Sequence, residues 1–349
     1  MPSQSTPAST ADASERVRPW QVLCLGEAML RLAATPGERL EQSNQLDVFV
    51  AGSELNVACL LARLGTRASW VSSLPDSILG RMVTHTAHGH GVDTSGVTWL
   101  DSRLGLLFTE SGAAPRPGQV VYDRADSAAS QMSIDDRDWA ALVAQADVLH
   151  LSGITPALSE SCAELCEHVA SLAASAGTLV SFDPNYRSRL WSVAEANAYC
   201  KRILPKVDVL AVSERDARSL LDVDGELDDI ALELQARWQL RAALITAGET
   251  SRQQTGHANA LAWAMSSDSQ ATLTHGPAFE VDVVDRIGAG DSSVAGLLVG
   301  VLRNDANVAA SYSAALSALA LASSGDINWA TEADVQTVLA ATAGSDIQR

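Results

Sequence analysis

Short runs of aliphatic and β-branched residues alternate along most of the chain with longer stretches in which apolar residues recur every three or four positions. Such short runs predict strands and such longer stretches predict helices. The pattern begins with QVLCLGEAML (21–30), SELNVACLLARLG (53–65), RASWVSSL (67–74) and ILGRMVTHTAHGHG (78–91). Strands that alternate with helices in this way are typical of βα units on a largely parallel sheet.

The alternation resumes in the second half of the chain. Strands are predicted at 147–153, 178–183, 208–213, 242–248, 260–267 and 279–285. Helices are predicted at 136–146, 159–176, 193–204 and around 214–237. The segment GAGDSSVAGLLVGVL (288–302) has the small and apolar residues of a tightly packed buried helix, and we expect the rest to be helical to about Ala341.

Between residues 97 and 124 the pattern changes. VTWL, RLGLLFTE and QVVYDR follow one another without intervening helices, and the turn-rich SGAAPRPG (111–118) separates the last two. Strands joined by such turns predict a small antiparallel flap, which we expect to form from residues near 40–52 and 97–124. The remainder of residues 20–341 is expected to be one large α/β domain, preceded by a disordered tail over residues 1–19.

The charge balance narrows the choice of partners. The chain has 42 acidic and 24 basic residues, which gives a formal net charge of −18. Such a field repels phosphate backbones and anionic lipid surfaces. No apolar run is as long as a bilayer-spanning helix requires. We therefore expect small-molecule partners, and neither nucleic acid nor a membrane.

Five cysteines are spread along the chain without a CxxC pair, namely Cys24, Cys59, Cys162, Cys166 and Cys200. Their apolar neighbours are typical of buried free thiols. The first residues have no apolar core of the kind found in secretory signals. We therefore expect a cytoplasmic protein. The spacing of Cys162 and Cys166 is interpreted as core packing on one helix face.

Other candidate sites are given structural interpretations. His85, His88 and His90 lie close together, but they lack cysteine or carboxylate partners at ligand spacing, so no protein-held metal site is predicted. His150 is interpreted as an interior histidine. The acidic run of residues 222–229 is interpreted as a solvated loop.

The strongest chemical signal is DRIGAGD (285–291), predicted to join a strand to a helix. Glycines at such a turn allow backbone N–H groups to approach an anion, and the helix N-terminus adds partial positive charge. The segment lacks the GK[ST] ending of a Walker A loop. Asp291 is a carboxylate at the position where a phosphoryl group is expected, and we interpret it as an acceptor for a hydroxyl proton.

These motifs resemble the ribokinase-like sugar kinases, also called PfkB carbohydrate kinases. DRIGAGD with SSVAGLLVG is similar to the C-terminal signature of that family, and AGSELNVACLLARLG (51–65) is similar to its N-terminal signature. The matches VYDRADSAAS (121–130), HLSGITPALS (150–159) and SFDPNYRSRLW (181–191) are most similar to 2-keto-3-deoxygluconate kinases. The resemblance implies a three-layer α/β fold with a β lid, and flap-to-flap pairing in a homodimer or higher homo-oligomer.

The resemblance also implies roles for particular residues. Asp291 would be the general base, and the N–H groups of Gly288, Ala289 and Gly290 would form an anion hole. On the substrate side, Gly52 and Asn56 would face sugar hydroxyls, and Tyr122, Arg124 and Arg187 would bind the keto-acid end. Arg124 is the residue expected to separate acid sugars from neutral ones. The alternative for Arg124 is a surface ion pair with Asp123 or Asp126.

ATP and Mg²⁺ are the implied cofactors, with Ser213, Asp216 and Gly248 joining Gly288 and Gly290 beside the nucleotide. Several positions depart from the family pattern: Leu107, Ser213, Ser292, Ser293 and Ala320 replace residues that the family commonly keeps. The expected reaction is ATP-dependent phosphorylation of the terminal hydroxyl of 2-keto-3-deoxygluconate. The alternatives are a kinase for 2-keto-3-deoxygalactonate, fructose or ribose, and a non-catalytic sugar-binding or nucleotide-binding regulator.

Overall fold

A computed structural model describes residues 18–112, 115–248, 257–264 and 270–342. In these ranges the largest sheet has eight strands, in the spatial order β14-β13-β12-β11-β10-β9-β1-β4. Neighbouring strands from β4 to β12 run parallel, and β13 and β14 continue the sheet in antiparallel pairing. The strands are β1 (Trp20–Leu25), β4 (Ala68–Val71), β9 (Ala146–Ser152), β10 (Leu179–Asp183), β11 (Val209–Ser213), β12 (Ala242–Gly248), β13 (His257–Trp263) and β14 (Thr272–His275).

Helices cover both faces of this sheet, so the expected α/β class is confirmed. One hydrophobic cluster joins one face to α1, α2, α8, α9 and α10, and a second joins the other face to α3 through α7. The helices are α1 (Ser53–Arg63), α2 (Ile78–Gly89), α3 (Trp139–Val143), α4 (Glu160–Ala176), α5 (Val193–Ile203), α6 (Glu214–Leu221), α7 (Leu227–Trp238), α8 (Ala289–Arg303), α9 (Ala306–Leu321) and α10 (Glu332–Thr342). Short 3₁₀ turns lie at Ala129–Gln131, Thr155–Ala157 and Leu204–Lys206.

The central strands are apolar on both faces because each face is covered. In β1, Val22 and Cys24 pack into the first cluster, whereas Leu23 and Leu25 pack into the second. Continuous apolar runs of this kind are typical of buried parallel strands. The carboxyl ends of such strands lie along one edge of the sheet, where α/β proteins bind their ligands.

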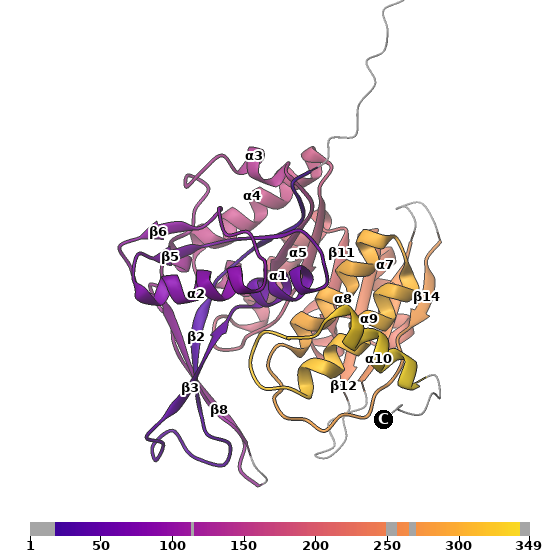
Figure 1. Cartoon of the computed structure of the whole chain (residues 1–349). Coiled ribbons are helices and arrows are strands. Elements are labelled where there is room, and N and C mark those ends of the chain that lie inside the picture. The colour runs from indigo at the N-terminus through magenta and orange to yellow at the C-terminus, as the bar shows by residue number, and fades with distance from the viewer. Residues whose placement is uncertain (1–17, 113–114, 249–256, 265–269, 343–349) are drawn as a thin grey trace, which may run out of the picture.

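A separate four-stranded sheet forms the flap, which projects from the layered body (Figure 1). Its order is β3 (Leu46–Ala51), β2 (Met29–Ala34), β7 (Gly105–Glu110) and β8 (Gln119–Asp123). The outer pairs are antiparallel, and the central pair of β2 and β7 is parallel.

Two details of the expected flap are corrected. The run 21–30 divides between β1 and β2, and β2, which lies outside the ranges expected for the flap, is one of its two central strands. Strand β6 (Thr98–Leu100) pairs with β5 (Ser73–Pro75) in a separate two-stranded sheet and does not join the flap.

The strand predicted at 279–285 is wrong, because this segment has no strand assignment in the structure. Phe279 and Val281 are buried in the first cluster, which explains the alternating pattern. The backbone N–H of Val284 donates to the carbonyl of Leu321 at the end of α9, over 2.8 Å. Alternating burial therefore arises here without a neighbouring strand.

Other expectations concern the chain ends and the thiols. Residues 1–17 of the expected tail lie outside the described residues, and Trp20 is the first residue of β1. All five cysteines are buried free thiols, as predicted. His150 is fully buried on β9, also as predicted. In the ranges that the structure describes, every helix is too short or too polar to cross a membrane.

Candidate functional site

The glycine turn before α8 has the conformation that an anion hole requires. Gly288 caps α8 with a φ of +83°, and a Cβ at this position would lie 2.2 Å from the carbonyl oxygen of Asp326. Both the backbone angle and the lack of space therefore require glycine here. The first N–H groups of a helix have no acceptors within the helix, so they are available to an anion.

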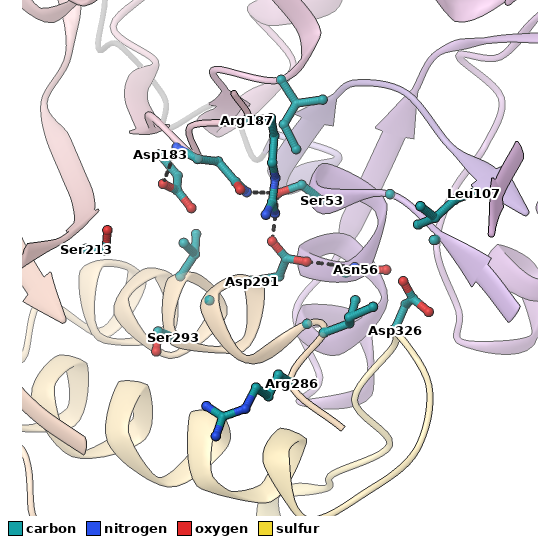
Figure 2. Close-up of a pocket in the computed structure, with 18 of the residues that line it drawn as sticks. Ser53, Asn56, Leu107, Asp183, Arg187, Ser213, Arg286, Asp291, Ser293 and Asp326 are labelled. Atoms are coloured by element: carbon teal, nitrogen blue, oxygen red, sulfur yellow. Dashed lines mark hydrogen bonds between the residues drawn. The ribbon is translucent and has the colours of Figure 1, made fainter. Parts of the chain in front are cut away.

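Asp291 lies in the first turn of α8 and is held by the first turn of α1. The Ser53 hydroxyl donates to Asp291 Oδ1 over 2.7 Å, and the Asn56 amide donates to Oδ2 over 2.7 Å. The Asn185 amide donates in turn to the Ser53 hydroxyl over 2.9 Å. Figure 2 shows the Asp291 carboxylate directed toward Ser53 and Asn56, with Arg187 extending toward the same group.

The surroundings of Asp291 shift its protonation in opposite directions. Burial raises the pKa of Asp291 above its ordinary value, and the hydrogen bonds from Asn56 and Ser53 counteract part of the rise. The positive charge of Arg187 also lowers this pKa. The result is a positioned carboxylate that is a better proton acceptor than an exposed aspartate.

The backbone at Gly52, which precedes α1, lies close to the backbone of Glu27 between β1 and β2. A Cβ on Gly52, which caps α1, would lie 2.4 Å from the carbonyl oxygen of Glu27. Without a side chain at this position, the start of α1 packs against the turn between β1 and β2. Ser53 and Asn56 consequently reach Asp291 from the opposite wall of the site. The N-termini of α1 and α8 both favour negative charge between them.

These groups line a pocket of about 450 Å³. One end is formed by the flap and the other by the carboxyl ends of β11 and β12, with the glycine turn between them. Its lining includes Met29, Gly52, Ser53, Asn56, Leu107, Tyr122, Arg124, Asp183, Asn185, Arg187, Ser213, Asp216, Thr246, Arg286, Gly288, Gly290, Asp291, Ser293 and Asp326.

The structure brings most of the predicted site residues together around this pocket. The expected catalytic and sugar-binding side chains and the expected nucleotide-binding positions Ser213 and Asp216 all line it. Among the described residues, Ala289 does not line the pocket, although its neighbour Gly288 does. Gly248 ends β12, and its surroundings lie outside the described part of the structure. The departures Leu107 and Ser293 also line the pocket, whereas Ala320 is buried elsewhere.

Arg124 has a partner that the sequence did not indicate. Its guanidinium donates to Glu27 Oε2, and the Ser127 hydroxyl donates to Glu27 Oε1 over 2.8 Å. The predicted alternative of a surface pair with Asp123 or Asp126 is wrong, because Arg124 is buried and its ion pair is with Glu27. Asp123 instead binds Arg103 over 2.7 Å. Arg124 Nε is buried without a hydrogen-bond partner in the described chain, and other atoms of Arg124 line the pocket.

Asp183 is a second carboxylate that the sequence analysis missed. It ends β10 and accepts the N–H of Asn185 through Oδ1 over 2.9 Å. Burial raises the pKa of Asp183 to about 8, and the negative charge of Asp291 contributes to the rise. Its position at the carboxyl end of a parallel strand was the signal that would have identified it.

The oxygen atoms at the end of the pocket formed by the carboxyl ends of β10 and β11 fit Mg²⁺ bound together with phosphates. Asp183, Asp216 and the Ser213 hydroxyl supply hard oxygen donors, which Mg²⁺ prefers. In the described residues there is no group of three or more His, Cys, Asp or Glu side chains able to hold a metal. Because Mg²⁺ is commonly held by one or two carboxylates and the phosphates of a substrate, this donor set fits a metal that arrives with a nucleotide.

Comparison with known proteins identifies close relatives of this arrangement. The sequence profile described as pfkB family carbohydrate kinase matches residues 20–333. A 2-dehydro-3-deoxygalactonokinase from Haloferax volcanii is 40% identical over 91% of this chain and 96% of its own length. A 2-dehydro-3-deoxygluconokinase from Bacillus subtilis is 36% identical over 48% of this chain and 51% of its own. The crystal structure of a 2-dehydro-3-deoxygluconokinase from Thermotoga maritima superimposes with a TM-score of 0.87 at 32% identity, covering 92% of this chain and 98% of that one.

Proposed function

The chain belongs to the pfkB family of carbohydrate kinases, and from that premise we propose that it transfers the terminal phosphoryl group of ATP to the terminal hydroxyl of 2-keto-3-deoxygluconate. The observation that carries the proposal is the position of Asp291. Its carboxylate lies in the first turn of α8, immediately after the glycine turn, and two hydrogen bonds from α1 fix its orientation.

In the proposed reaction Asp291 accepts the proton of the attacking hydroxyl. The N–H groups at Gly288, Ala289 and Gly290 stabilise the charge on the moving phosphoryl group. Phosphoryl transfer has a loose transition state that needs little proton removal at the start, so orientation of the hydroxyl matters more than the basicity of the carboxylate. The bonds from Ser53 and Asn56 supply this orientation.

Unsatisfied polar atoms in the flap end of the pocket support binding of an acid sugar. Asn56 lines this end of the pocket, and its Oδ1 is buried without a hydrogen-bond partner in the described chain. Arg187 lines the same pocket, where its positive charge acts on Asp291 and Asp183. Arg187 and Arg124 would provide donors for the carboxylate and keto group of the substrate.

The opposite end of the pocket is proposed to bind ATP with Mg²⁺. Ser213, Asp216 and Asp183 would hold the metal, and Gly248 ends the neighbouring strand beside the expected nucleotide. When bound, Mg²⁺ neutralises charge on the phosphates, which the acidic chain would otherwise repel.

A second substrate is favoured by one specific observation. The Haloferax volcanii relative, 40% identical over 91% of this chain, is named a 2-dehydro-3-deoxygalactonokinase. The galactonate and gluconate forms of the sugar acid are epimers that differ at one hydroxyl. Both present the same carboxylate and the same terminal hydroxyl to the residues described above. We therefore include 2-keto-3-deoxygalactonate as the alternative substrate.

The proposal includes association of two chains through their flaps. Val48 and Val121 in the flap are each 50% exposed, and they lie in one row across the flap with Leu32 and Phe108 between them. Burial of such side chains against a second copy would be favourable. Light scattering is expected to give twice the chain mass of 36.6 kDa, and substitution of Val48 and Val121 by Ser is expected to shift the mass toward that of one chain.

An assay of ADP release with Mg·ATP tests the proposed activity. The panel contains both 2-keto-3-deoxy epimers, fructose and ribose, and Asp291→Asn is the matched inactive control. The expected result is turnover of the two acid sugars well above that of the neutral sugars. Faster turnover of fructose or ribose would contradict the proposed substrate class, and no turnover of any sugar would leave the regulator alternative.

A further inference from the structure

Arg31 is a buried arginine at the junction between the flap and the glycine turn. It is the third residue of β2, which lies between β3 and β7 in the flap. Its side chain is only 4% exposed, and it is not among the side chains that line the pocket in the described part of the chain. No step of the reaction above uses it. Because arginine stays charged at any depth, its burial requires compensating partners.

Two carboxylates and one aromatic ring surround the Arg31 guanidinium. Nη2 donates to Asp285 Oδ2 over 2.7 Å, and Nε lies 2.7 Å from Asp326 Oδ2. The guanidinium carbon lies 4.6 Å from the centroid of the Phe49 ring on β3. The same ring packs against Gly325, where an added Cβ would lie 3.2 Å from Phe49.

Both carboxylates belong to loops that build the anion hole. Asp285 accepts the N–H of Ile287 in the glycine turn over 3.2 Å, and its other oxygen accepts the N–H of Gly325 over 3.4 Å. The carbonyl of Asp326 occupies the space beside Gly288 in which no side chain fits. Arg31 therefore contacts the two loops whose mutual position determines the shape of the turn.

The negative charges of the carboxylates around the glycine turn are compensated by the positive charge of Arg31. Burial raises the pKa of Asp326 to about 7, and the charges of Asp285 and Asp291 add to the rise. The positive charge of Arg31 lowers this pKa. A nucleotide brings further negative charge to the same place. Without Arg31, two carboxylates beside the anion hole would remain uncompensated and would repel the phosphates.

We propose that Arg31 is a positioning residue for phosphoryl transfer, which acts through Asp285 and Asp326 to hold the two loops of the anion hole in place and to cancel the charge that these loops would present to ATP. The inference rests on the proposed function, because it assigns the anion hole to the phosphoryl group. It also connects the flap, which lines the sugar end of the pocket through Met29 and Leu107, to the loops at the donor end.

The test uses the full-length wild type, Arg31→Met, Arg31→Lys and Arg31→Met/Asp326→Asn. Arg137→Met is the matched control, because Arg137 also binds backbone and side-chain oxygens, at Gly96 and Thr98, away from the pocket. For each protein the assay gives kcat and the KM values for ATP and sugar, and circular dichroism confirms folding. The sugar is the one that the wild type phosphorylates fastest, so failure of the wild type with acid sugars refutes the substrate proposal without affecting the comparison of variants.

Loss of a direct oxyanion-hole donor typically costs about 10²–10³ in kcat, and we expect a smaller loss of about tenfold to a hundredfold in kcat/KM for ATP in Arg31→Met. The KM for sugar is expected to change little, and Arg31→Lys is expected to recover part of the activity because it restores the charge without the planar fork. In the double variant only the Asp285 charge remains uncompensated, so folding and the KM for ATP are expected to recover in part while kcat stays low.

Wild-type kcat and KM for ATP in folded Arg31→Met would overturn the proposal, as would an equal loss in Arg137→Met. A double variant with wild-type kcat would overturn the positioning role. If Arg31→Met does not fold, the double variant and Arg31→Lys carry the same comparison. If the wild type phosphorylates no sugar, calorimetric titration with Mg·ATP replaces the kinetic assay, and unchanged nucleotide affinity in the folded variants would again overturn the proposal.

Discussion

Arg124 donates a hydrogen bond to Glu27, a residue 97 positions earlier in the chain, and both side chains are buried. Glu27 lies in the turn that joins the main sheet to the flap, and Arg124 directly follows the last strand of the flap. The pair therefore connects the flap to the body of the protein at the edge of the pocket. It also gives Arg124 two separate contributions, one to folding and one to the proposed binding of a carboxylate.

Substitution of Arg124 should distinguish acid sugars from neutral ones. Arg124→Ala is expected to lower kcat/KM for the acid sugar by about two to three orders of magnitude, because a buried charge that loses its partner costs roughly 2–5 kcal/mol. A neutral ketose should be affected much less. The measurement is kcat/KM for both sugars in both proteins.

Removal of Arg124 also leaves Glu27 without its cation, so the control is Arg124→Ala/Glu27→Gln. This double variant is expected to regain the folding stability that Arg124→Ala loses, because no unpaired buried carboxylate remains. It should nevertheless retain the defect for the acid sugar. Equal losses for acid and neutral sugars in the double variant would remove Arg124 from the substrate site.

Asp291→Asn is expected to abolish turnover while binding of the sugar survives. The amide keeps the shape of the carboxylate but cannot accept the proton, and positioned proton transfer typically contributes about 10²–10⁴-fold. Single-turnover kinetics measures the chemical step, and calorimetry measures sugar affinity. Turnover within a few-fold of the wild type would show that Asp291 is not the general base.

Ser53→Ala is expected to move the acid limb of the pH profile of kcat/KM to higher pH. The Ser53 hydroxyl donates to the ionised form of Asp291 and lowers its pKa, so its loss favours the protonated carboxyl. A single hydrogen bond to a charged group corresponds to a shift of about one pH unit. Because activity requires ionised Asp291, the variant is expected to lose activity at a higher pH than the wild type does as the pH falls. An unchanged limb would indicate that another group controls it.

Glu54→Gln is expected to stabilise the protein at pH 8 but not at pH 4. Glu54 is fully buried in α1 and accepts hydrogen bonds from Ser152 and Thr155 through Oε1, which glutamine preserves. Burial raises the pKa of Glu54 from 4.5 to about 7. The folded state therefore favours the protonated form, so its contribution to stability is complete below about pH 4.5 and is lost as the pH rises to about 7.

Above pH 7 Glu54 is ionised in both the folded and the unfolded state, and the wild type is expected to be less stable than Glu54→Gln by about 3 kcal/mol. Urea unfolding at both pH values measures the difference, with exposed Glu164→Gln on α4 as the matched control. A variant less stable than the wild type at pH 8 would contradict the burial of a neutral carboxyl.

The sequence determined the features that depend on neighbouring residues. The alternation of apolar runs established the α/β class, because a parallel strand buried on both faces is apolar throughout and a covering helix is apolar on one side. The glycine turn and Asp291 were recognised although the strand predicted before them is absent, because a glycine turn followed directly by a helix needs no distant partner to place an anion at the helix N-terminus.

Only the tertiary structure decided features that depend on distant residues. The segment 279–285 has the alternating apolar pattern of a strand, yet its backbone hydrogen-bonds to the end of α9. The alternation depends only on which side chains are buried, and it does not determine which backbone groups form hydrogen bonds with the segment. Likewise, an arginine and a carboxylate carry no mark of their partner in the sequence. Arg124 binds Glu27, and Arg31 binds Asp285 and Asp326, because the packing of the flap against the body brings these charges within hydrogen-bond distance of each other.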